Sequence, residues 1–154
     1  LASEIYQQIP ERFSLSFDGT FWHWGHAEYF LSKEQEKRDI SQIKIIWTDV
    51  DEAMIQKAQS LTKVYEKNIQ IFHSSYARID EISQEAWLFD FELLDLWVNL
   101  EHFKDGSRGF SIKTDAPLDM RFDQWKTTQT ASERLQKVKP EILQQALIQY
   151  GDFS

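Results

Sequence analysis

Acidic and small polar residues follow four apolar runs of the sequence, at the points where strands would end. These segments begin at Asp18, Asp49, His73 and Asp95. In an open parallel sheet, ligands bind outside the carboxyl ends of the strands, so side chains there are the ones that contact them. Asp49 lies 24 residues after Gly25, a suitable distance for a carboxylate that accepts hydrogen bonds from ribose hydroxyls. Asp49 alone is more simply explained as a helix cap, but four such ends together favour a nucleotide-type ligand.

The elements that would position these residues alternate in type along the chain. Alternating polar and apolar residues predict a strand at 14–17, and apolar runs predict strands at 43–47, 69–72 and 88–94. Helices are predicted at 1–9, 26–38, 52–66, 79–87, 130–138 and 140–150. Asp51 is a suitable N-cap for the third of these helices. The alternation is typical of βαβ units, so the expected fold class is α/β with a parallel sheet. The fourth strand is so apolar that we expect it to be buried on both faces.

Charge and composition argue against several classes of protein. A net charge of −8 over 154 residues argues against a protein that holds nucleic acid by electrostatics alone. The segment 101–139 nevertheless holds eight Lys or Arg against six Asp or Glu. We expect any RNA contact there, through Lys104, Arg108 and Lys113, although ordinary scatter of surface charge explains the balance equally well. The absence of cysteine and the spacing of the four histidines predict no metal site. No apolar run is long enough for a membrane span, so we expect a cytoplasmic location.

Several short strings of the sequence match motifs with fixed spacing. The longest joins R-G-F-S at 108–111 to P-L-D-M-R at 117–121 and then Asp123, without a gap relative to R-G-F-S-x-x-x-x-x-P-L-D-M-R-x-D. Shorter strings are D-G-T-F at 18–21 followed by G-H at 25–26, T-D-V-D at 48–51, L-L-D-L at 93–96 and Y-G-D-F at 150–153. Together they resemble the bacterial-type 16S rRNA (cytosine-N4)-methyltransferase family over nearly the whole chain.

The resemblance implies a fold, a reaction and a division of the chain. The fold would be a partial Rossmann-like sheet of the class I methyltransferases, with a C-terminal helical segment. Residues 1–98 would form the core that binds S-adenosylmethionine (SAM), and residues 99–154 a loop and the start of a helical insertion. The irregular stretch 95–129 is too long for a passive connection, which favours a functional loop. The implied reaction is SAM-dependent methylation of the N4 of a cytidine in small-subunit rRNA, with that rRNA as the partner.

The family's functional residues carry over onto six positions of this chain. The implied SAM contacts are Gly25, His26, Asp49, Tyr76, Asp95 and His102. Asp49 would hold the ribose and Tyr76 the adenine, whereas His102 stands where the family commonly has Gln. Asp95 is the implied catalytic residue, because a carboxylate can accept a proton of the cytosine amine and orient its lone pair toward the methyl group.

Four tryptophans stand where the family has glycine, and they leave a second function open. They are Trp22, Trp24, Trp47 and Trp97. Glycine lets a backbone approach a cofactor closely, whereas tryptophan fills much of the volume of an adenosine. The alternative is therefore a catalytically silent derivative, engineered or natural, whose cleft is filled by Trp and which binds little SAM. Such a chain would act as a structural or binding module. Burial of aromatic area in the core would explain the same residues without cleft filling.

A sheet that ends at its fourth strand would leave an apolar edge with unpaired backbone groups. Soluble proteins rarely tolerate such an edge, and the single charge of Glu92 is weak protection against pairing with another strand. The C-terminal helices or a different chain could cover this edge, but we favour a homodimer in which two copies of the strand at 88–94 pair about a two-fold axis.

Overall fold

The computed structural model describes residues 1–20, 25–82, 88–96, 98–124 and 126–151. The chain divides into two compact units, Leu1–Trp97 and Val98–Ser154. None of the described helices is long and apolar enough to cross a membrane.

The first unit is built on a parallel sheet of four strands. These are β1 (Leu15–Asp18), β2 (Lys44–Asp49), β3 (Ile69–His73) and β4 (Phe91–Leu93), in the order β3-β2-β1-β4. Asp18 lies opposite Trp47 of β2 on one side and Leu93 of β4 on the other. The expected α/β fold with a parallel sheet, consistent with a Rossmann-like class I methyltransferase, is thereby confirmed.

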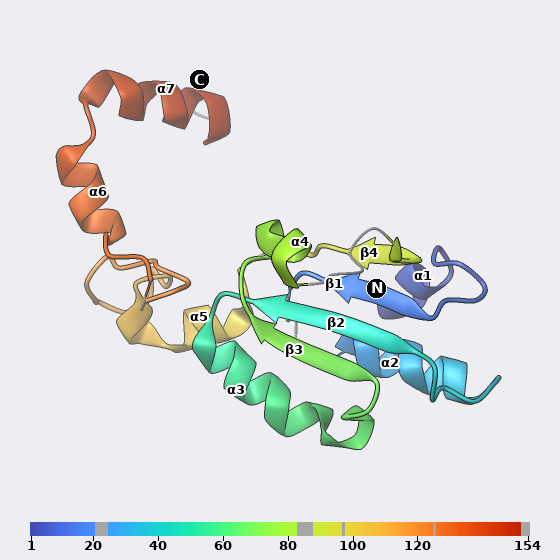
Figure 1. Ribbon diagram of the computed structural model, residues 1–154. Coiled ribbons are helices and arrows are strands. Elements are labelled where there is room, and N and C mark those ends of the chain that lie inside the picture. The colour runs from blue at the N-terminus through green and yellow to red at the C-terminus, as the bar shows by residue number, and fades with distance from the viewer. Residues whose placement is uncertain (21–24, 83–87, 97, 125, 152–154) are drawn as a thin grey trace. The chain divides into compact units, whose positions relative to one another are not determined.

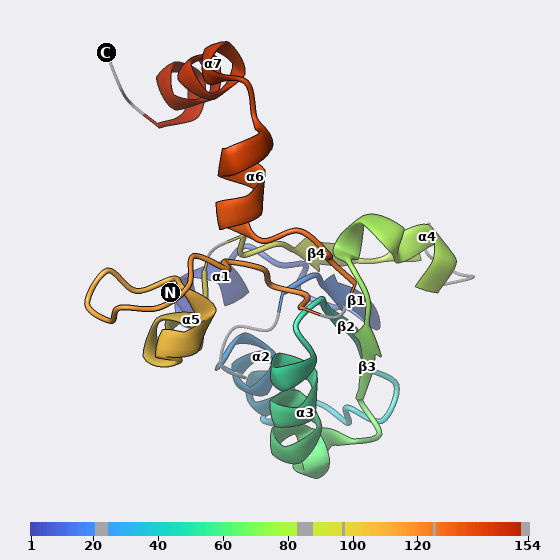
Figure 2. The ribbon, with the colours of Figure 1, turned by 90° about the vertical axis from the view of Figure 1, so that its left-hand side faces the viewer.

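Helices cover the sheet in the manner that βαβ connections require. In Figures 1 and 2, α2 (Gly25–Gln35) and α3 (Glu52–Leu61) lie together on one side of the sheet, whereas α4 (Ile79–Ile82) lies on the other. The remaining elements are α1 (Ala2–Tyr6) and the 3-10 turns η1 (Thr62–Tyr65) and η2 (Tyr76–Arg78). Asp51 is the N-cap of α3, as predicted, because its carboxylate accepts the Ala53 N–H at 3.0 Å.

The apolar core lies between the sheet and the pair α2 and α3. Its buried members come from β2, β3, both helices and the segments before β1 and β2: Phe13, Ala27, Phe30, Leu31, Ile43, Ile45, Trp47, Met54, Ala58 and Ile69. Trp47 is only 2% exposed and belongs to this cluster. Its indole therefore stabilises the fold by burying apolar area. The other three tryptophans at glycine positions lie outside the described residues.

The fourth strand differs from the expectation. It spans three residues rather than seven, and it is not buried on both faces. Phe91 and Leu93 are half-buried, whereas Glu92 is exposed, which explains a charged residue in the middle of an apolar run. Leu88 and Leu94 are also exposed. β4 is less buried than expected because it pairs only with β1 among the described strands, and a strand at an edge buries less of its surface than a central one.

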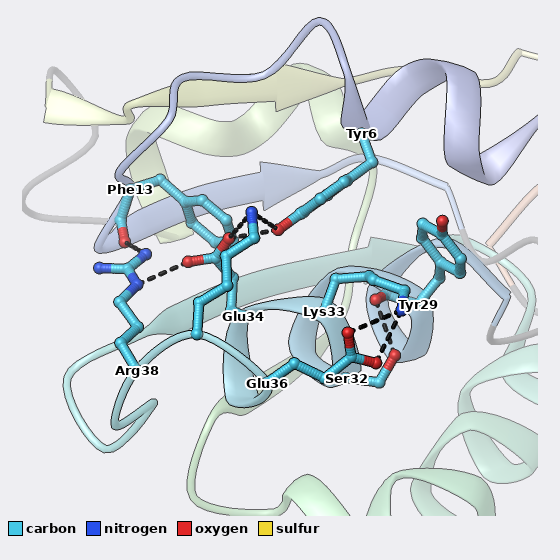
Figure 3. A network of polar contacts seen from close by, with 9 residues as sticks. Tyr6, Phe13, Tyr29, Ser32, Lys33, Glu34, Glu36 and Arg38 are labelled. Atoms are coloured by element: carbon cyan, nitrogen blue, oxygen red, sulfur yellow. Dashed lines mark hydrogen bonds and ion pairs between the residues drawn. The ribbon is translucent and has the colours of Figure 1, made fainter.

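A buried carboxylate joins α1 and the segment before β1 to α2 (Figure 3). Glu34 is 2% exposed and accepts from Tyr6 Oη and from Arg38 Nε, each at 2.5 Å. The Arg38 guanidinium also donates to the Phe13 carbonyl at 2.8 Å. Burial raises the pKa of Glu34, but the hydrogen bonds from Tyr6 and Arg38 outweigh it and hold that pKa below its ordinary value.

Glu34→Gln is expected to lower the free energy of unfolding at pH 7 by about 2 kcal/mol, because hydrogen bonds to a charged group are worth roughly 1.5–3 kcal/mol each. A carboxylate with a lowered pKa stabilises the fold above its ordinary pKa and loses that effect as pH falls. Parent and variant should therefore converge in acid, as measured by urea denaturation across pH. Glu36→Gln is the matched control: Glu36, directly after α2, forms an exposed pair with Lys33 and its replacement should change stability little. Equal losses in the two variants would contradict the role of Glu34.

The second unit contains three short helices and an ordered loop. The helices are α5 (Leu100–Lys104), α6 (Ala131–Lys137) and α7 (Pro140–Tyr150), and the turn η4 covers Gly106–Arg108. The two helices expected near the C-terminus are present, each within a residue of the predicted bounds. The stretch expected to be irregular instead contains α5 and η4, whose five and three residues are too short to produce a periodic pattern.

The R-G-F-S and P-L-D-M-R strings hold each other in place within this unit. The buried Arg108 guanidinium donates to the carbonyls of Arg121 and Phe122 at 2.8 and 3.0 Å. Gly109 has φ +74°, and a Cβ there would lie 2.5 Å from the Pro117 carbonyl oxygen, so only glycine fits. The Asp119 carboxylate takes two hydrogen bonds from the Arg121 guanidinium, at 2.7 and 2.8 Å. These strings therefore specify the shape of the loop.

Candidate functional site

The carboxyl ends of β1 and β4 form the point at which the strand order of the sheet reverses. From β1 the chain proceeds to β2 and β3 on one side, and then returns to place β4 on the other side of β1. Ligands of open α/β sheets bind outside such a reversal. The residues at this position are Asp18, Gly19 and Thr20 after β1, and Leu94 and Asp95 after β4.

Asp18 is a buried acid at the centre of this region. It is 5% exposed, and its carboxylate accepts the Thr20 N–H at 3.2 Å. Burial, and to a smaller extent the nearby Asp95, raise the pKa of Asp18, whereas hydrogen bonds from Thr20 and Trp47 lower it; the net pKa is about 7. Asp18 therefore changes its charge near neutral pH, unlike an ordinary carboxyl group.

Two hydrogen bonds continue the pairing of β1 and β4 beyond the strands. Gly19 N–H donates to the Leu93 carbonyl at 2.9 Å, and Asp95 N–H donates to Thr20 Oγ1 at 3.1 Å. Asp95 is half-buried. It is also close enough to His26 to raise that residue's pKa, although burial has the larger effect and lowers it.

Gly19 allows Tyr76 and Leu94 to approach the end of β1. A Cβ on Gly19 would lie 2.3 Å from Leu94 Cδ2 and 2.9 Å from Tyr76 Cβ. Any larger residue would force these side chains away. Tyr76 begins η2, three residues after the end of β3, and is 40% exposed, so part of its ring remains accessible.

The first turn of α2 contains Gly25 and His26, two of the residues expected to contact SAM. Among the described atoms, none lies within 4 Å of a Cβ built on Gly25, so the space beside this helix start is open. His26 is buried and stacks on Phe30 with 6.2 Å between ring centroids. Burial lowers the pKa of His26, which favours the neutral form of the imidazole.

Asp49 ends β2, next to β1 in the sheet. Its side chain accepts the Asp51 N–H at 2.8 Å, which orients the carboxylate, and its carbonyl accepts the Ser74 N–H at 3.0 Å. His73 pairs with Asp49 in the ladder, and its ring Nε2 lies 3.0 Å from the Val50 carbonyl oxygen. Across the described ranges, no three acidic or histidine side chains group so as to hold a metal ion.

His102 belongs to the second unit, and its described contacts are structural. Its Nδ1 accepts the Asn99 N–H at 3.2 Å as part of a capping box. The ring stacks on Phe110 at 5.2 Å and meets Phe122 edge-on at 5.0 Å. Arg108 was expected to contact RNA. It is 7% exposed and its guanidinium donates hydrogen bonds to carbonyls of the loop, so that expectation is wrong for this residue. Lys104 and Lys113 are exposed.

The site residues expected in the first unit therefore fall into neighbouring groups at the carboxyl edge of the sheet. Tyr76, Asp95 and His26 surround the end of β1, and Asp49 lies at the end of the next strand. Asp18 and Thr20 also lie here, in the strand-end segment that the sequence indicated, although neither is among the six residues carried over from the family. Their signal is the D-G-T string, where an acid and a hydroxyl flank a glycine at a strand end.

Comparisons with known proteins agree with the motifs. The chain is 34% identical over 137 residues to the ribosomal RNA small subunit methyltransferase H of Methylobacillus flagellatus, covering 88% of this chain and 40% of that protein. It is 36% identical over 138 residues to the ribosomal RNA small subunit methyltransferase H 1 of Lachnoclostridium phytofermentans, covering 88% and 36%. The chain thus spans well under half the length of these relatives. The MraW methylase family matches residues 1–154, and the chain belongs to that family.

Proposed function

We propose that this chain is part of a SAM-dependent methyltransferase that acts on the N4 of a cytidine in small-subunit rRNA. The observation that carries the proposal is the set of polar residues at the carboxyl ends of adjacent strands, around the reversal of strand order. The names of the two relatives supply the substrate class. They favour this function over a catalytically silent derivative, and the buried position of Trp47 in the core removes one of the four residues on which that alternative rested.

The residues at this edge fit SAM in their chemistry. Asp49 would accept hydrogen bonds from the ribose hydroxyls, since its carboxylate lies at the end of β2 and is oriented by the Asp51 N–H. The accessible ring of Tyr76 suits the adenine, and the open space at Gly25, beside His26, suits the methionine end near a helix N-terminus. SAM supplies a methyl group on a positively charged sulfur.

Asp95 is the proposed catalytic residue. The exocyclic amine of cytosine is a poor nucleophile because its lone pair is delocalised into the ring. A carboxylate that accepts one amine proton orients the nitrogen and removes the proton as the new bond forms. The cytosine must leave its stack to reach such a group.

The proposal is tested by calorimetric titration of the chain with SAM. We expect saturable binding, and Asp49→Ala should weaken it at least about tenfold, because charge-assisted hydrogen bonds are worth roughly 1.5–3 kcal/mol each. Asp39→Ala is the matched control, since Asp39 precedes β2 at the opposite end of the sheet and should leave the Kd unchanged. Absence of saturable binding by the parent would favour the alternative function, and an unchanged Kd in Asp49→Ala would refute the role of Asp49.

We also propose that the protein acts in the cytoplasm, where small-subunit rRNA is found, and that it forms a homodimer. Support for the dimer is the position of β4 as an edge strand that pairs only with β1 among the described strands. Pairing of β4 with β4 of a second copy would satisfy its outer backbone groups. Light scattering should then give twice the chain mass of 18.3 kDa. A single-chain mass that persists on concentration would rule the dimer out.

A further inference from the structure

The residue proposed as the proton acceptor is tied to β1 by a side-chain hydroxyl. Ladder pairing of β1 and β4 ends at Asp18 and Leu93, and the Gly19 N–H then donates to the Leu93 carbonyl. Two residues after Leu93, the Asp95 N–H donates to Thr20 Oγ1 at 3.1 Å instead of to a backbone carbonyl. The position of the Asp95 backbone therefore depends on a side chain that can be changed without altering the strand.

Thr20 is held in turn by Asp18. Its N–H donates to Asp18 Oδ1 at 3.2 Å. Burial raises the pKa of Asp18, and hydrogen bonding by Thr20 lowers it. Thr20 therefore contacts Asp18 through its backbone N–H, while its hydroxyl oxygen accepts from the Asp95 N–H. Asp18 is a firm anchor because it is buried at the end of a strand that is paired on both sides.

We propose that Thr20, which is anchored to Asp18 through its backbone N–H, is a positioning residue whose hydroxyl holds Asp95 where its carboxylate accepts a proton from the amine that is methylated. This inference rests on the proposed function. A small displacement of a group that must meet a reacting atom costs a large part of the rate. Thr20 acts through Asp95 and needs no contact with either substrate.

The hydrogen bond is tested first, by amide hydrogen exchange of the chain. Thr20→Val keeps the size of the side chain but cannot accept a hydrogen bond, whereas Thr20→Ser keeps the hydroxyl. Exchange at the Asp95 amide should be at least about tenfold faster in Thr20→Val and close to the parent in Thr20→Ser. The Gly19 amide donates to a backbone carbonyl and should keep its protection in both variants. Unchanged exchange at Asp95 in Thr20→Val overturns the inference.

The positioning role is tested by methyl transfer in the full-length protein. Thr20→Val should lower kcat at least about tenfold with little change in the Kd for SAM, and Thr20→Ser should restore it. If Thr20→Val is poorly folded, Thr20→Ala takes its place. In an Asp95→Ala background the loss of the Thr20 hydroxyl should cost nothing more, because the two residues act as one unit. A further loss of similar size in that background would show a merely structural role and overturn the inference.

Failure of the proposed function is distinguishable from failure of this inference. A parent protein that neither binds SAM nor methylates rRNA overturns the proposed function and with it the catalytic role of Thr20. Exchange at the Asp95 amide still decides whether Thr20 holds that residue. If the parent is active and the Thr20→Val variant keeps its kcat, the proposed function stands and only the inference is overturned.

Discussion

Asp95→Ala is expected to lower kcat for methyl transfer to rRNA by about 10²–10⁴-fold, the usual contribution of a positioned general base. The variant removes the carboxylate but keeps the backbone N–H that donates to Thr20, so the end of β4 should stay in place. The Kd for SAM should change much less than kcat, because the effect lies in the transfer step. Single-turnover methylation of small-subunit rRNA by the full-length protein, with binding measured separately, checks both quantities.

Glu92→Ala is the matched control for Asp95→Ala. Glu92 is an acid of the same strand region, three residues earlier, and its side chain is exposed. Its removal should leave kcat close to that of the parent. Activity of Asp95→Ala within about threefold of the parent would rule out a proton-accepting role, since general bases contribute far more.

Asp18→Asn is expected to stabilise the fold at neutral and alkaline pH. Burial raises the pKa of Asp18 from 3.8 to about 7, so folding is favoured when this group is protonated. The parent therefore loses stability as pH rises from about 4 to about 7, because the unfolded chain releases the proton over that range and the folded chain holds it. Asparagine has nearly the same shape and no charge to bury. One pKa unit corresponds to about 1.4 kcal/mol, so the gain above pH 7 is on the order of 4 kcal/mol.

The measurement is urea denaturation of parent and variant between pH 4 and pH 8. The difference should be small at the acid end, grow with pH and level off near neutrality. Asp90→Asn provides a control of opposite sign, because the N–H groups of Leu15 and Ser14 lower the pKa of Asp90. That variant should be destabilised at neutral pH and approach the parent in acid. A gain from Asp18→Asn that does not depend on pH would contradict the assignment.

Much of the fold follows from patterns that are local in the sequence. Alternating or apolar runs predicted β1, β2 and β3 to within one or two residues, because strand propensity and alternation act over a few neighbours. The cap at Asp51 was predicted for the same reason, since a carboxylate bonds an N–H two residues ahead. The R-G-F-S and P-L-D-M-R strings indicated the family through their spacing alone, which the comparisons confirmed.

Tertiary structure decided the features that depend on residues far apart in the chain. The side chains of β4 are at most half-buried because this strand pairs only with β1 among the described strands. No local pattern of the sequence reveals which strand lies at an edge. Arg108 is buried because its guanidinium donates hydrogen bonds to carbonyls thirteen and fourteen residues away. Its charge is therefore not available for contact with RNA. Trp47 is buried because residues of α2 and α3 pack with it in the core. The raised pKa of Asp18 and the hydrogen bond from Asp95 to Thr20 exist only because the sheet brings residues 18 and 95 together, and burial and proximity, unlike propensity, are created by folding.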